Sequence, residues 1–360
     1  MTNANIILTG FMGSGKSTVG RLLAQRLQFE FVDTDDVIEA RDGRTIAAIF
    51  AEEGEPYFRR LEAQVAQELA QRRGLVVATG GRLMLDQRNA AALGGTGAVF
   101  CLAATAEEIM DRLAGKPGQR PLLDMPDPME RMRELLQERE SGYGRFPQIS
   151  TSGKTPQQLV GEIQLLLDQD ILNITYPHGQ YNVVVGSELL SNVRHLSGIR
   201  GPLAIVTDSN VGPLHAERCG QVHCIVTIPA GEKHKTLATV QGIYDQLLAA
   251  GLDRQGTILA LGGGVVGDVA GFVAATYMRG IDFVQCPTSL LAMVDASVGG
   301  KTGVDLPQGK NLVGAFKQPS GVYADLTTLI TLPTEEFAAG MGEVIKHCLF
   351  ANPALFERLE

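Results

Sequence analysis

Residues 5–27 read NIILTGFMGSGKSTVGRLLAQRL, and this stretch decides the fold of the first half of the chain. An apolar run leads into a glycine-rich turn, and the residues from Lys16 onward carry apolar side chains at helical spacing. The turn fits G-x-x-x-x-G-K-[ST] through Gly10, Gly15, Lys16 and Ser17. Strand, turn and helix in this order predict a P-loop, which binds nucleotide phosphates and Mg²⁺, rather than a chance turn with an exposed lysine.

The rest of the first half repeats this alternation of predicted strands and helices. Buried-type strands are expected at 29–35, 74–81 and 97–105, and amphipathic helices at 58–73 and 161–169. Strands that alternate with helices predict an α/β fold, in which helices cover both faces of a parallel sheet.

A change in character near residues 168–178 predicts a domain boundary. Pro177 and Gly179 interrupt the pattern, and a β-branched run begins at Val183. A second alternation of strands and helices follows, without an evident internal repeat. The length of 360 residues agrees with two domains of about 150 residues each.

Composition excludes several classes of protein. The net charge is −9, from 31 basic and 40 acidic residues, which argues against a nucleic-acid surface but not against small anionic ligands. No apolar run approaches the roughly 18 residues that span a bilayer, and no signal peptide is evident. We therefore expect a cytoplasmic protein that does not associate with a membrane. The five cysteines are scattered and are expected to be reduced thiols.

Two carboxylates, Asp33 and Asp35, follow the second predicted strand. Alternation along a strand places both side chains on the same side. One carboxylate can hold Mg²⁺ through water, and the other can accept the proton of an attacking hydroxyl. Solvated acids at a strand end are the alternative, which is less expected for a pair that follows a P-loop.

Four arginines are candidate contacts for an anionic substrate. Arg59 and Arg60 begin the helix at 58–73, and a guanidinium fork suits a carboxylate. Arg120 and Arg139 lie in polar segments flanked by proline and glycine, which could form a lid over phosphate and substrate. For each arginine alone, an ordinary surface position is the alternative.

Residues 1–167 resemble shikimate kinase along their whole length. The resemblance rests on GFMGSGKSTVG, FVDTDDVIE, GEPYFRRLE, TGG, RPLL, R-x-x-x-Y at 139–143 and STSGKTPQQLV. It implies phosphorylation of shikimate by ATP with Mg²⁺. It also implies that Ser17 and, through water, Asp33 hold the Mg²⁺ ion.

The same resemblance assigns further residues to ligands and to catalysis. The ATP site would be formed by Gly13, Ser14, Gly15, Lys16, Ser17, Thr18 and Arg120, with residues 152–155 near adenine. The shikimate site would be formed by Asp35, Arg59, Gly80, Gly81 and Arg139, and catalysis would depend on Lys16, Asp35 and Arg120. The family usually has three consecutive glycines, whereas this chain has Arg82 after Gly81. Arg82 could crowd the shikimate site or add a contact to the shikimate carboxylate.

A second glycine-rich stretch, LALGGGVVGDVAGF at 259–272, lies between another predicted strand and helix. It lacks the G-x-G-x-x-G dinucleotide fingerprint and is a weak signal by itself. Charged and amide side chains gather in the glycine-rich turns that follow, which favours a site for a small polyanion over separate exposed lysines. They are Arg279, Asp295, Lys301, Lys310, Asn311 and Lys317.

Residues 181–350 resemble the N-terminal, NAD-binding part of 3-dehydroquinate synthase. The resemblance rests on IVTDSNV, PAGEKHKT, LALGGGVVGDVAGFVAATYMRGI, CPTSLLAMVDASVGGKTGVDLPQGKNLVGAF and LPTEEFAAGMGEVIKH. It implies three regions: a P-loop kinase domain at 1–168, a Rossmann-like NAD-binding domain at 178–325, and the start of a truncated helical domain for metal and substrate at 326–360.

This second resemblance implies three groups of site residues. NAD⁺ would be bound by Asp208, Asn210, Glu232, Lys233, Gly263, Gly264, Asp268, Thr288, Ser289, Asp295, Lys301 and Lys310. The substrate phosphate would be bound by Arg279, Lys301 and Asn311, with Arg279 reaching across a homodimer. Catalysis near the reacting ring would depend on Lys301, Lys310 and Lys346, and Glu343 would be the first ligand of Zn²⁺ or another divalent ion.

The two resemblances together imply a bifunctional enzyme of aromatic amino acid biosynthesis. The synthase part would use NAD⁺ transiently to convert 3-deoxy-D-arabino-heptulosonate 7-phosphate to 3-dehydroquinate with loss of phosphate. The two histidines that bind zinc in the family would fall beyond Glu360. We therefore expect a longer chain, but not this one, to convert the heptulosonate phosphate to 3-dehydroquinate. His347 lies one helical turn after Glu343 but is not a ligand in the family.

Two other interpretations remain open. The chain could act only as a shikimate kinase, with residues 178–360 an inactive remnant. It could also be a non-catalytic nucleotide-binding or dimerising module. Coupled assays of both reactions distinguish the three interpretations.

Overall fold

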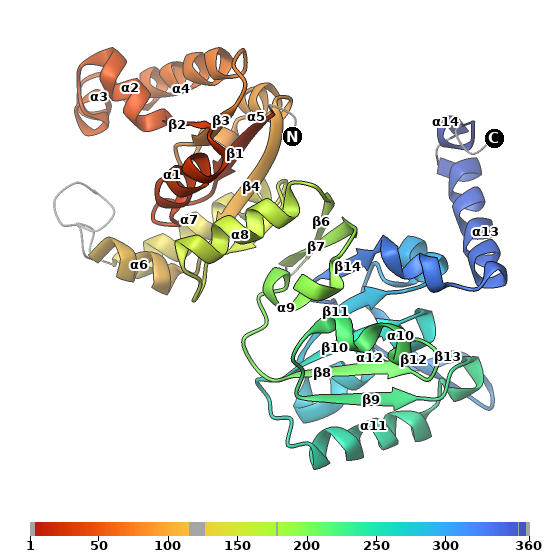
Figure 1. Ribbon diagram of the computed structural model, residues 1–360. Helices are drawn as coiled ribbons and strands as arrows, with labels where there is room; N and C mark the ends of the chain where they lie inside the picture. Colours follow the sequence, from red (N-terminus) through yellow and green to blue (C-terminus); the bar gives the residue numbers. More distant parts are fainter. Residues whose placement is uncertain (1–3, 115–126, 178, 352, 358–360) are drawn as a thin grey trace. The chain divides into compact units, whose positions relative to one another are not determined.

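The computed structural model describes residues 4–114, 127–177, 179–351 and 353–357 (Figure 1). The chain forms two compact units, Met1–Leu167 (unit 1) and Asp168–Glu360 (unit 2). Both units contain a largely parallel sheet with helices, which confirms the predicted α/β class. Within the described ranges, no helix is both long enough and apolar enough to cross a membrane.

Unit 1 is built on a five-stranded sheet. Its strands are β1 (Asn5–Thr9), β2 (Glu30–Asp33), β3 (Leu75–Ala78), β4 (Gly97–Ala103) and β5 (Gln148–Ser150). The strand order is β2-β3-β1-β4-β5, and every neighbouring pair is parallel. All residues of β1 are buried, as expected for a central strand that is covered on both faces.

The helices of unit 1 cover this sheet. They are α1 (Lys16–Leu27), α2 (Thr34–Asp42), α3 (Ile46–Glu53), α4 (Glu55–Leu69), the 3₁₀ turn η1 (Leu83–Leu85), α5 (Gln87–Gly94), α6 (Ala106–Ala114), α7 (Pro128–Tyr143) and α8 (Pro156–Leu166). One buried cluster packs α4 and α5 against β1 and β3. A second cluster packs α6 and α7 around Phe11 of the P-loop and Cys101 of β4, so the loop rests on a rigid apolar base.

The order of strands in unit 1 creates a site for a ligand. The chain leaves β1 toward β2 on one side of the sheet and leaves β4 toward β5 on the other. The carboxyl ends of β1 and β4 therefore flank a topological switch point, where open α/β sheets bind ligands. The P-loop begins at the end of β1, which places it at this point.

Unit 2 is built on a seven-stranded sheet and a separate two-stranded hairpin. The strands of the large sheet are β6 (Asp170–Tyr176), β7 (Gly179–Gly186), β8 (Leu203–Asp208), β9 (Cys224–Ile228), β10 (Thr257–Gly262), β11 (Asp282–Pro287) and β14 (Val322–Asp325). Their order is β6-β7-β14-β11-β10-β8-β9, and only the pair of β6 and β7 is antiparallel. The hairpin consists of β12 (Lys301–Leu306) and β13 (Gly309–Phe316).

The helical segments of unit 2 include two long helices beside the large sheet, α11 (Leu237–Ala249) and α12 (Gly264–Thr276), and the C-terminal α13 (Thr334–Ala351). The short segments are η2 (Leu190–Asn192), α9 (Val193–Leu196), α10 (Gly212–His215), η3 (Ala216–Cys219), η4 (Glu232–His234), η5 (Tyr277–Arg279), the π-helical turn η6 (Ala292–Ala296), η7 (Leu326–Thr331) and α14 (Pro353–Phe356). The chain leaves β8 toward β9 and leaves β10 toward β11, so a second switch point lies between the carboxyl ends of β8 and β10.

The segment in which the sequence analysis placed a boundary is a strand. Residues 170–176 form β6, which pairs with β7 over its whole length at one edge of the large sheet. Its residues are all exposed or only partly buried. β6 is an edge strand, whose backbone hydrogen-bonds to β7 alone. Because so little of its surface is buried, it lacks the continuous apolar run that identifies the buried strands in the sequence.

Candidate active sites

The P-loop of unit 1 is shaped by glycines at two positions. Gly10 follows β1 with a φ of +128°, and a Cβ there would lie 2.4 Å from the carbonyl oxygen of Leu102 in β4, so only glycine fits. Gly15, with a φ of +98°, is the N-cap of α1 and supplies no side-chain cap. The first N–H groups of α1 therefore remain available to an anion, at the positive end of the helix dipole.

Two predicted side chains of the P-loop point to where phosphate and metal would lie. Lys16 Nζ donates to the carbonyl oxygens of Gly10 at 2.8 Å and Phe11 at 2.9 Å, so the ammonium group lies within the curve of the loop. Ser17 Oγ donates to Asp33 Oδ2 at 2.6 Å. The hydroxyl and the carboxylate are therefore adjacent, as two groups around one Mg²⁺ ion must be.

Asp35, in the first turn of α2, faces Gly80 and Glu62. A Cβ on Gly80 would lie 2.7 Å from Asp35 Oδ1 and 2.9 Å from Glu62 Oε1. Both oxygens are buried and have no hydrogen-bond partner within the described part of the chain. Burial, and then the charge of Asp33, raise the pKa of Asp35 to about 6, although Lys16 opposes them. A carboxylate with this pKa is suited to accept a proton near neutral pH.

A cavity of about 520 Å³ opens beside Glu62, and arginines from two elements line it. Arg59 of α4 donates to Glu62 Oε2 at 2.5 Å and to Glu55 Oε1 at 2.9 Å. Arg82, in the turn after β3, donates to the same oxygen of Glu55 at 2.8 Å. The cavity therefore combines two guanidinium groups with two carboxylates, of which Glu55 is exposed and Glu62 is buried.

Arg139 of α7 lies on another side of the Gly80–Gly81 turn. A Cβ on Gly81 would lie 3.9 Å from Arg139 Nη1, and the Tyr143 hydroxyl donates to the carbonyl oxygen of Gly81. The Arg139 guanidinium carbon also lies 4.9 Å from the centre of the Phe11 ring, in the P-loop. The structure thus brings Arg139, Gly81 and the P-loop together.

Of the other predicted arginines, only Arg60 can be placed, and it is not part of this arrangement. Arg60 is exposed, lies over the Tyr57 ring at 5.4 Å and does not line the cavity. Arg120 lies outside the described residues.

Two side chains that the sequence analysis did not single out belong to the site. Glu62 follows Arg59 by three residues on α4, a spacing at which helical side chains meet, so its pairing had a visible signal. Arg112 of α6 donates to the carbonyl oxygen of Gly13 at 3.3 Å and to Thr151 Oγ1 at 3.0 Å. Arg112 links the P-loop to the segment expected near adenine, but it is one charge on an amphipathic helix and has no motif.

The second glycine turn of the chain lies at the switch point of unit 2. β10 ends at Gly262, and Gly263 is the N-cap of α12 without a side-chain cap. A Cβ on Gly264 would lie 3.4 Å from the Cβ of Ala296, and one on Gly263 would lie 3.5 Å from Ser289 Oγ. The N-terminus of α12 therefore faces the segment after β11, across a space that glycine leaves open.

Other residues expected near NAD⁺ surround this turn. Across the switch point, Asp208 Oδ1 accepts hydrogen bonds from the N–H groups of Asn210 at 2.8 Å and Val211 at 2.9 Å. The N–H of Thr288 donates to the carbonyl oxygen of Gly262 at 3.0 Å. The Asp208 contacts close the turn after β8, and the Thr288 contact holds the segment after β11 beside the end of β10.

A cavity of about 780 Å³ lies between α12 and the hairpin of β12 and β13. The predicted residues Asp268, Asp295, Lys301 and Asn311 line it. Lys235, which the sequence analysis missed, is 4% exposed and donates to Asp268 Oδ2 and Asn311 Oδ1, both at 2.5 Å. Burial raises the pKa of Asp268, while Lys235 opposes this shift.

The remaining cationic residues lie at different distances from this cavity. Lys310 Nζ donates to Glu232 Oε1 at 3.1 Å, and Lys233 follows Glu232 in η4 with an exposed side chain. Arg279 is exposed beyond the C-terminal end of α12, about 20 Å along the helix from Gly264 at 1.5 Å per residue. Arg279 is not among the residues that line this cavity.

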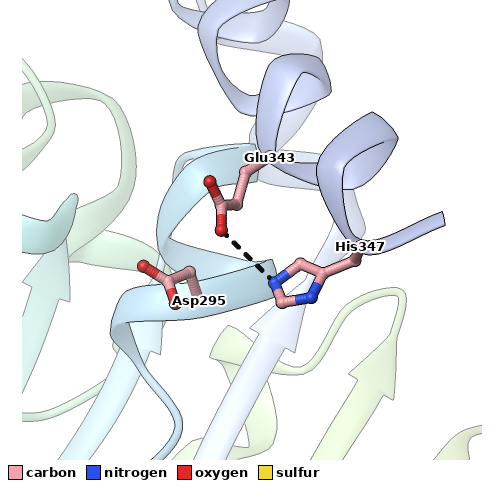
Figure 2. Close-up of side chains that lie close together, drawn as sticks. All are labelled: Asp295, Glu343 and His347. Atoms are coloured by element: carbon pink, nitrogen blue, oxygen red, sulfur yellow. Dashed lines mark ion pairs between the residues drawn. The ribbon is translucent and has the colours of Figure 1, made fainter. Parts of the chain in front are cut away.

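Three possible metal ligands meet where α13 passes η6. Figure 2 shows Asp295, Glu343 and His347 directed toward a common space, and their ligand atoms all lie within 4.8 Å of one another. Glu343 Oε1 lies 3.4 Å from His347 Nε2 and accepts from Lys346 Nζ at 2.6 Å. Two carboxylates and an imidazole are donors that Zn²⁺ and related ions bind, so the residues fit such an ion.

The fold and sites define a P-loop phosphotransferase joined to an NAD-type α/β enzyme unit. A family model for shikimate kinase matches residues 12–168, and one for the N-terminal part of 3-dehydroquinate synthase matches residues 225–339. The bifunctional shikimate kinase/3-dehydroquinate synthase of Thermotoga maritima is 35% identical over 349 residues, which are 96% of this chain and 68% of the relative. The chain belongs to this bifunctional shikimate kinase/3-dehydroquinate synthase family.

Relatives of the single units were also found. The 3-dehydroquinate synthase of Pelobacter propionicus is 48% identical over 200 residues, which are 53% of this chain and 56% of the relative. A shikimate kinase from Acinetobacter baumannii, solved in complex with shikimate, is 39% identical, with a TM-score of 0.44 over 46% of this chain and 93% of that chain. The chain spans about two thirds of the bifunctional relative and about half the length of the synthase relatives.

Proposed function

We propose that unit 1 transfers the terminal phosphate of Mg-ATP to a hydroxyl of shikimate. The observation that carries this proposal is the pair of buried, unpartnered carboxylate oxygens of Asp35 and Glu62 beside Gly80. Ring hydroxyls can donate hydrogen bonds to them, and the ring carboxylate can bind Arg59 and Arg139. A buried acceptor without a donor costs free energy until a ligand supplies one, so the site favours a polyol over an apolar ring.

Each residue then has a step in the reaction. Asp35 accepts the proton of the attacking hydroxyl, because its pKa of about 6 keeps it ionised at neutral pH and still basic. Lys16 and the first N–H groups of α1 face the phosphates and stabilise their charge. Ser17 and Asp33 would hold Mg²⁺, and the ion would supply positive charge that offsets the charge of the phosphates. Shikimate-dependent ADP release tests the proposal, and no release above the shikimate-free rate contradicts it.

We further propose that unit 2 binds NAD⁺ at its switch point and the phosphate of a heptulosonate in the cavity beside the hairpin. The nucleotide phosphates would lie on the N-terminus of α12 at Gly264, where a glycine turn opens a helix. Lys301 and Asn311 line the cavity and offer donors to the substrate phosphate. NAD⁺ supplies a hydride acceptor that is regenerated in each turnover, while Lys310 and Lys346 stabilise charge on the ring oxygens.

The NAD⁺ site predicts an effect of filling the space in front of α12. We expect Gly264→Leu to weaken NAD⁺ binding at least about tenfold, because its side chain enters the space between α12 and Ala296. Titration calorimetry with the whole chain in saturating Mg-ADP keeps the P-loop occupied and measures this change. Gly242→Leu is the control, since a Cβ at Gly242 on α11 meets no atom within 4 Å. Equal affinities in two variants that melt alike would contradict the site.

The proposed role of Glu343 as a metal ligand predicts a change in the binding of metal ions. We expect the chain to bind Co²⁺, with visible absorption from ligated metal, and Glu343→Gln to weaken binding by about tenfold or more, since even outer partners of ligands typically contribute 10- to 100-fold. Glu335→Gln, at an exposed position in the first turn of α13, is the control. Asp295 and His347 are the nearest other donors. A Co²⁺ spectrum that is unchanged in Glu343→Gln argues against this ligand.

A further inference from the structure

Two arginines from separate elements meet at one carboxylate oxygen in unit 1. Arg59 of α4 and Arg82 of the turn after β3 lie 2.9 Å and 2.8 Å from Glu55 Oε1. The side chains of Arg82 and Glu55 are 50% and 47% exposed. Ion pairs this exposed are weak, because water screens them, so a ligand carboxylate can replace Glu55 at little cost.

The two arginines differ in how many partners they have. Arg59 is held by a second, buried carboxylate, since Arg59 Nη1 donates to Glu62 Oε2 at 2.5 Å. For Arg82, Glu55 is the hydrogen-bond partner that the described residues supply. A guanidinium group has five N–H donors in a planar fork. Arg82 therefore keeps donors for a ligand that enters the cavity, whereas Arg59 is fixed in place.

Arg82 lies in the wall of the cavity that Arg59 and Glu62 also line. It directly follows Gly80 and Gly81, the turn that Asp35 and Arg139 approach. The cavity beside it keeps a volume of about 520 Å³ with Arg82 as one of its lining residues, and this size is in the range of small-molecule sites. Arg82 therefore borders an open cavity and can reach a carboxylate that enters it, which favours an added carboxylate contact, one of the two possibilities that the sequence left open.

We propose that Arg82 is a specificity-determining residue of the kinase site, which moves from Glu55 to the carboxylate of the bound substrate. The inference rests on the proposed kinase function of unit 1. The substrate class is a ring polyol that carries a carboxylate, and Arg82 discriminates it from the same ring with an uncharged ester. The carboxylate does not change charge in the reaction, so its contact acts equally on the ground state and the transition state. Its loss should raise KM and leave kcat nearly unchanged.

The test compares Arg82→Ala with a matched arginine variant, Arg88→Ala. Arg88 is exposed on α5 and is near residues of the cavity wall in the sequence, but it does not itself line the cavity. We expect Arg82→Ala to raise KM for shikimate about tenfold, the size of one charge-assisted hydrogen bond, and to change kcat less than about twofold. The preference for shikimate over its methyl ester should fall by the same factor. Arg82→Lys should restore part of it, and Arg88→Ala should resemble the parent chain.

The outcomes separate this inference from the kinase proposal. An unchanged KM in Arg82→Ala overturns the role of Arg82, and a lowered KM shows that Arg82 crowds the site instead. If the parent chain releases no shikimate-dependent ADP, the kinase proposal fails. Calorimetric titration of shikimate into the parent chain, Arg82→Ala and Arg88→Ala still decides the Arg82 contact in that case, because binding does not require turnover. Absence of binding to the parent chain then contradicts both proposals.

Discussion

Lys16→Ala should lower kcat for shikimate phosphorylation by about 10³-fold, while KM for shikimate changes little. Lys16 Nζ lies within the P-loop on the carbonyl oxygens of Gly10 and Phe11, at the place where the transferred phosphate would be. Charge on the phosphate oxygens is redistributed in the transition state, so a fixed cation there is worth most at that moment. The measurement is steady-state ADP release in a coupled assay at saturating Mg-ATP.

The control for Lys16→Ala is built into the chain. Unit 2 is a separate compact unit, so NAD⁺ binding measured on the same sample reports the amount of intact protein, while melting of unit 1 at the temperature of the parent chain shows that the variant is folded. Lys16→Arg keeps the charge but has a planar fork in place of a compact ammonium, and it should remain strongly impaired. Turnover at the parent rate in Lys16→Ala would falsify the role of this lysine.

Asp35→Asn should lower kcat by about 10²- to 10⁴-fold, the usual contribution of a general base. In the parent chain, kcat/KM should rise with pH through about 6, because only the ionised carboxylate accepts the proton. The amide does not titrate, so the acid limb should disappear from the residual activity of the variant. The pH dependence of kcat/KM between about pH 5 and pH 8 measures both effects.

The same substitution should stabilise unit 1 at neutral pH. Burial raises the pKa of Asp35 above that of an unfolded chain, so the folded state binds more protons between about pH 4 and pH 6 and its free energy of unfolding falls as pH rises through that window. Asp35→Asn removes this loss, on the order of 2 kcal/mol at pH 7. Asp36→Asn, at an exposed neighbour, is the control for both activity and stability. An unchanged acid limb in Asp35→Asn, or a variant less stable than the parent chain, would argue against this assignment.

The P-loop of unit 1 could be predicted from local sequence patterns, whereas the acceptor pair of Asp35 and Glu62 depends on tertiary contacts. The P-loop is local, because glycine spacing, a preceding apolar strand and a following helix lie within residues 5–27. The approach of Asp35 and Glu62 to Gly80 depends instead on β3 lying beside β2 and on α4 packing over both. No spacing in the sequence encodes that order of strands, so the acceptor pair could not be inferred before the fold.

Unit 2 shows the same division between local and distant contacts. The turn at Gly263 and Gly264 was visible as a pattern between a strand and a helix. Lys235 was not, because a lysine in a polar run is normally solvated, and only the hairpin and α12 together bury it on Asp268 and Asn311. Arg279 was assigned to the substrate phosphate by resemblance, and its place beyond the far end of α12 leaves that role to be tested with a second copy of the chain.

The joint between the two units is very short, and this affects how they can be handled. α8 ends at Leu166 and β6 begins at Asp170. Leu167 still donates to the carbonyl oxygen of Ile163, and the Gln169 side chain accepts from the N–H of Ser187 at 3.1 Å. The sequence has neither lysine nor arginine between Lys154 and Arg194, so trypsin has no bond to cleave there. Translation of one chain therefore makes the two units in equal numbers, and trypsin has no site in the joint at which to separate them.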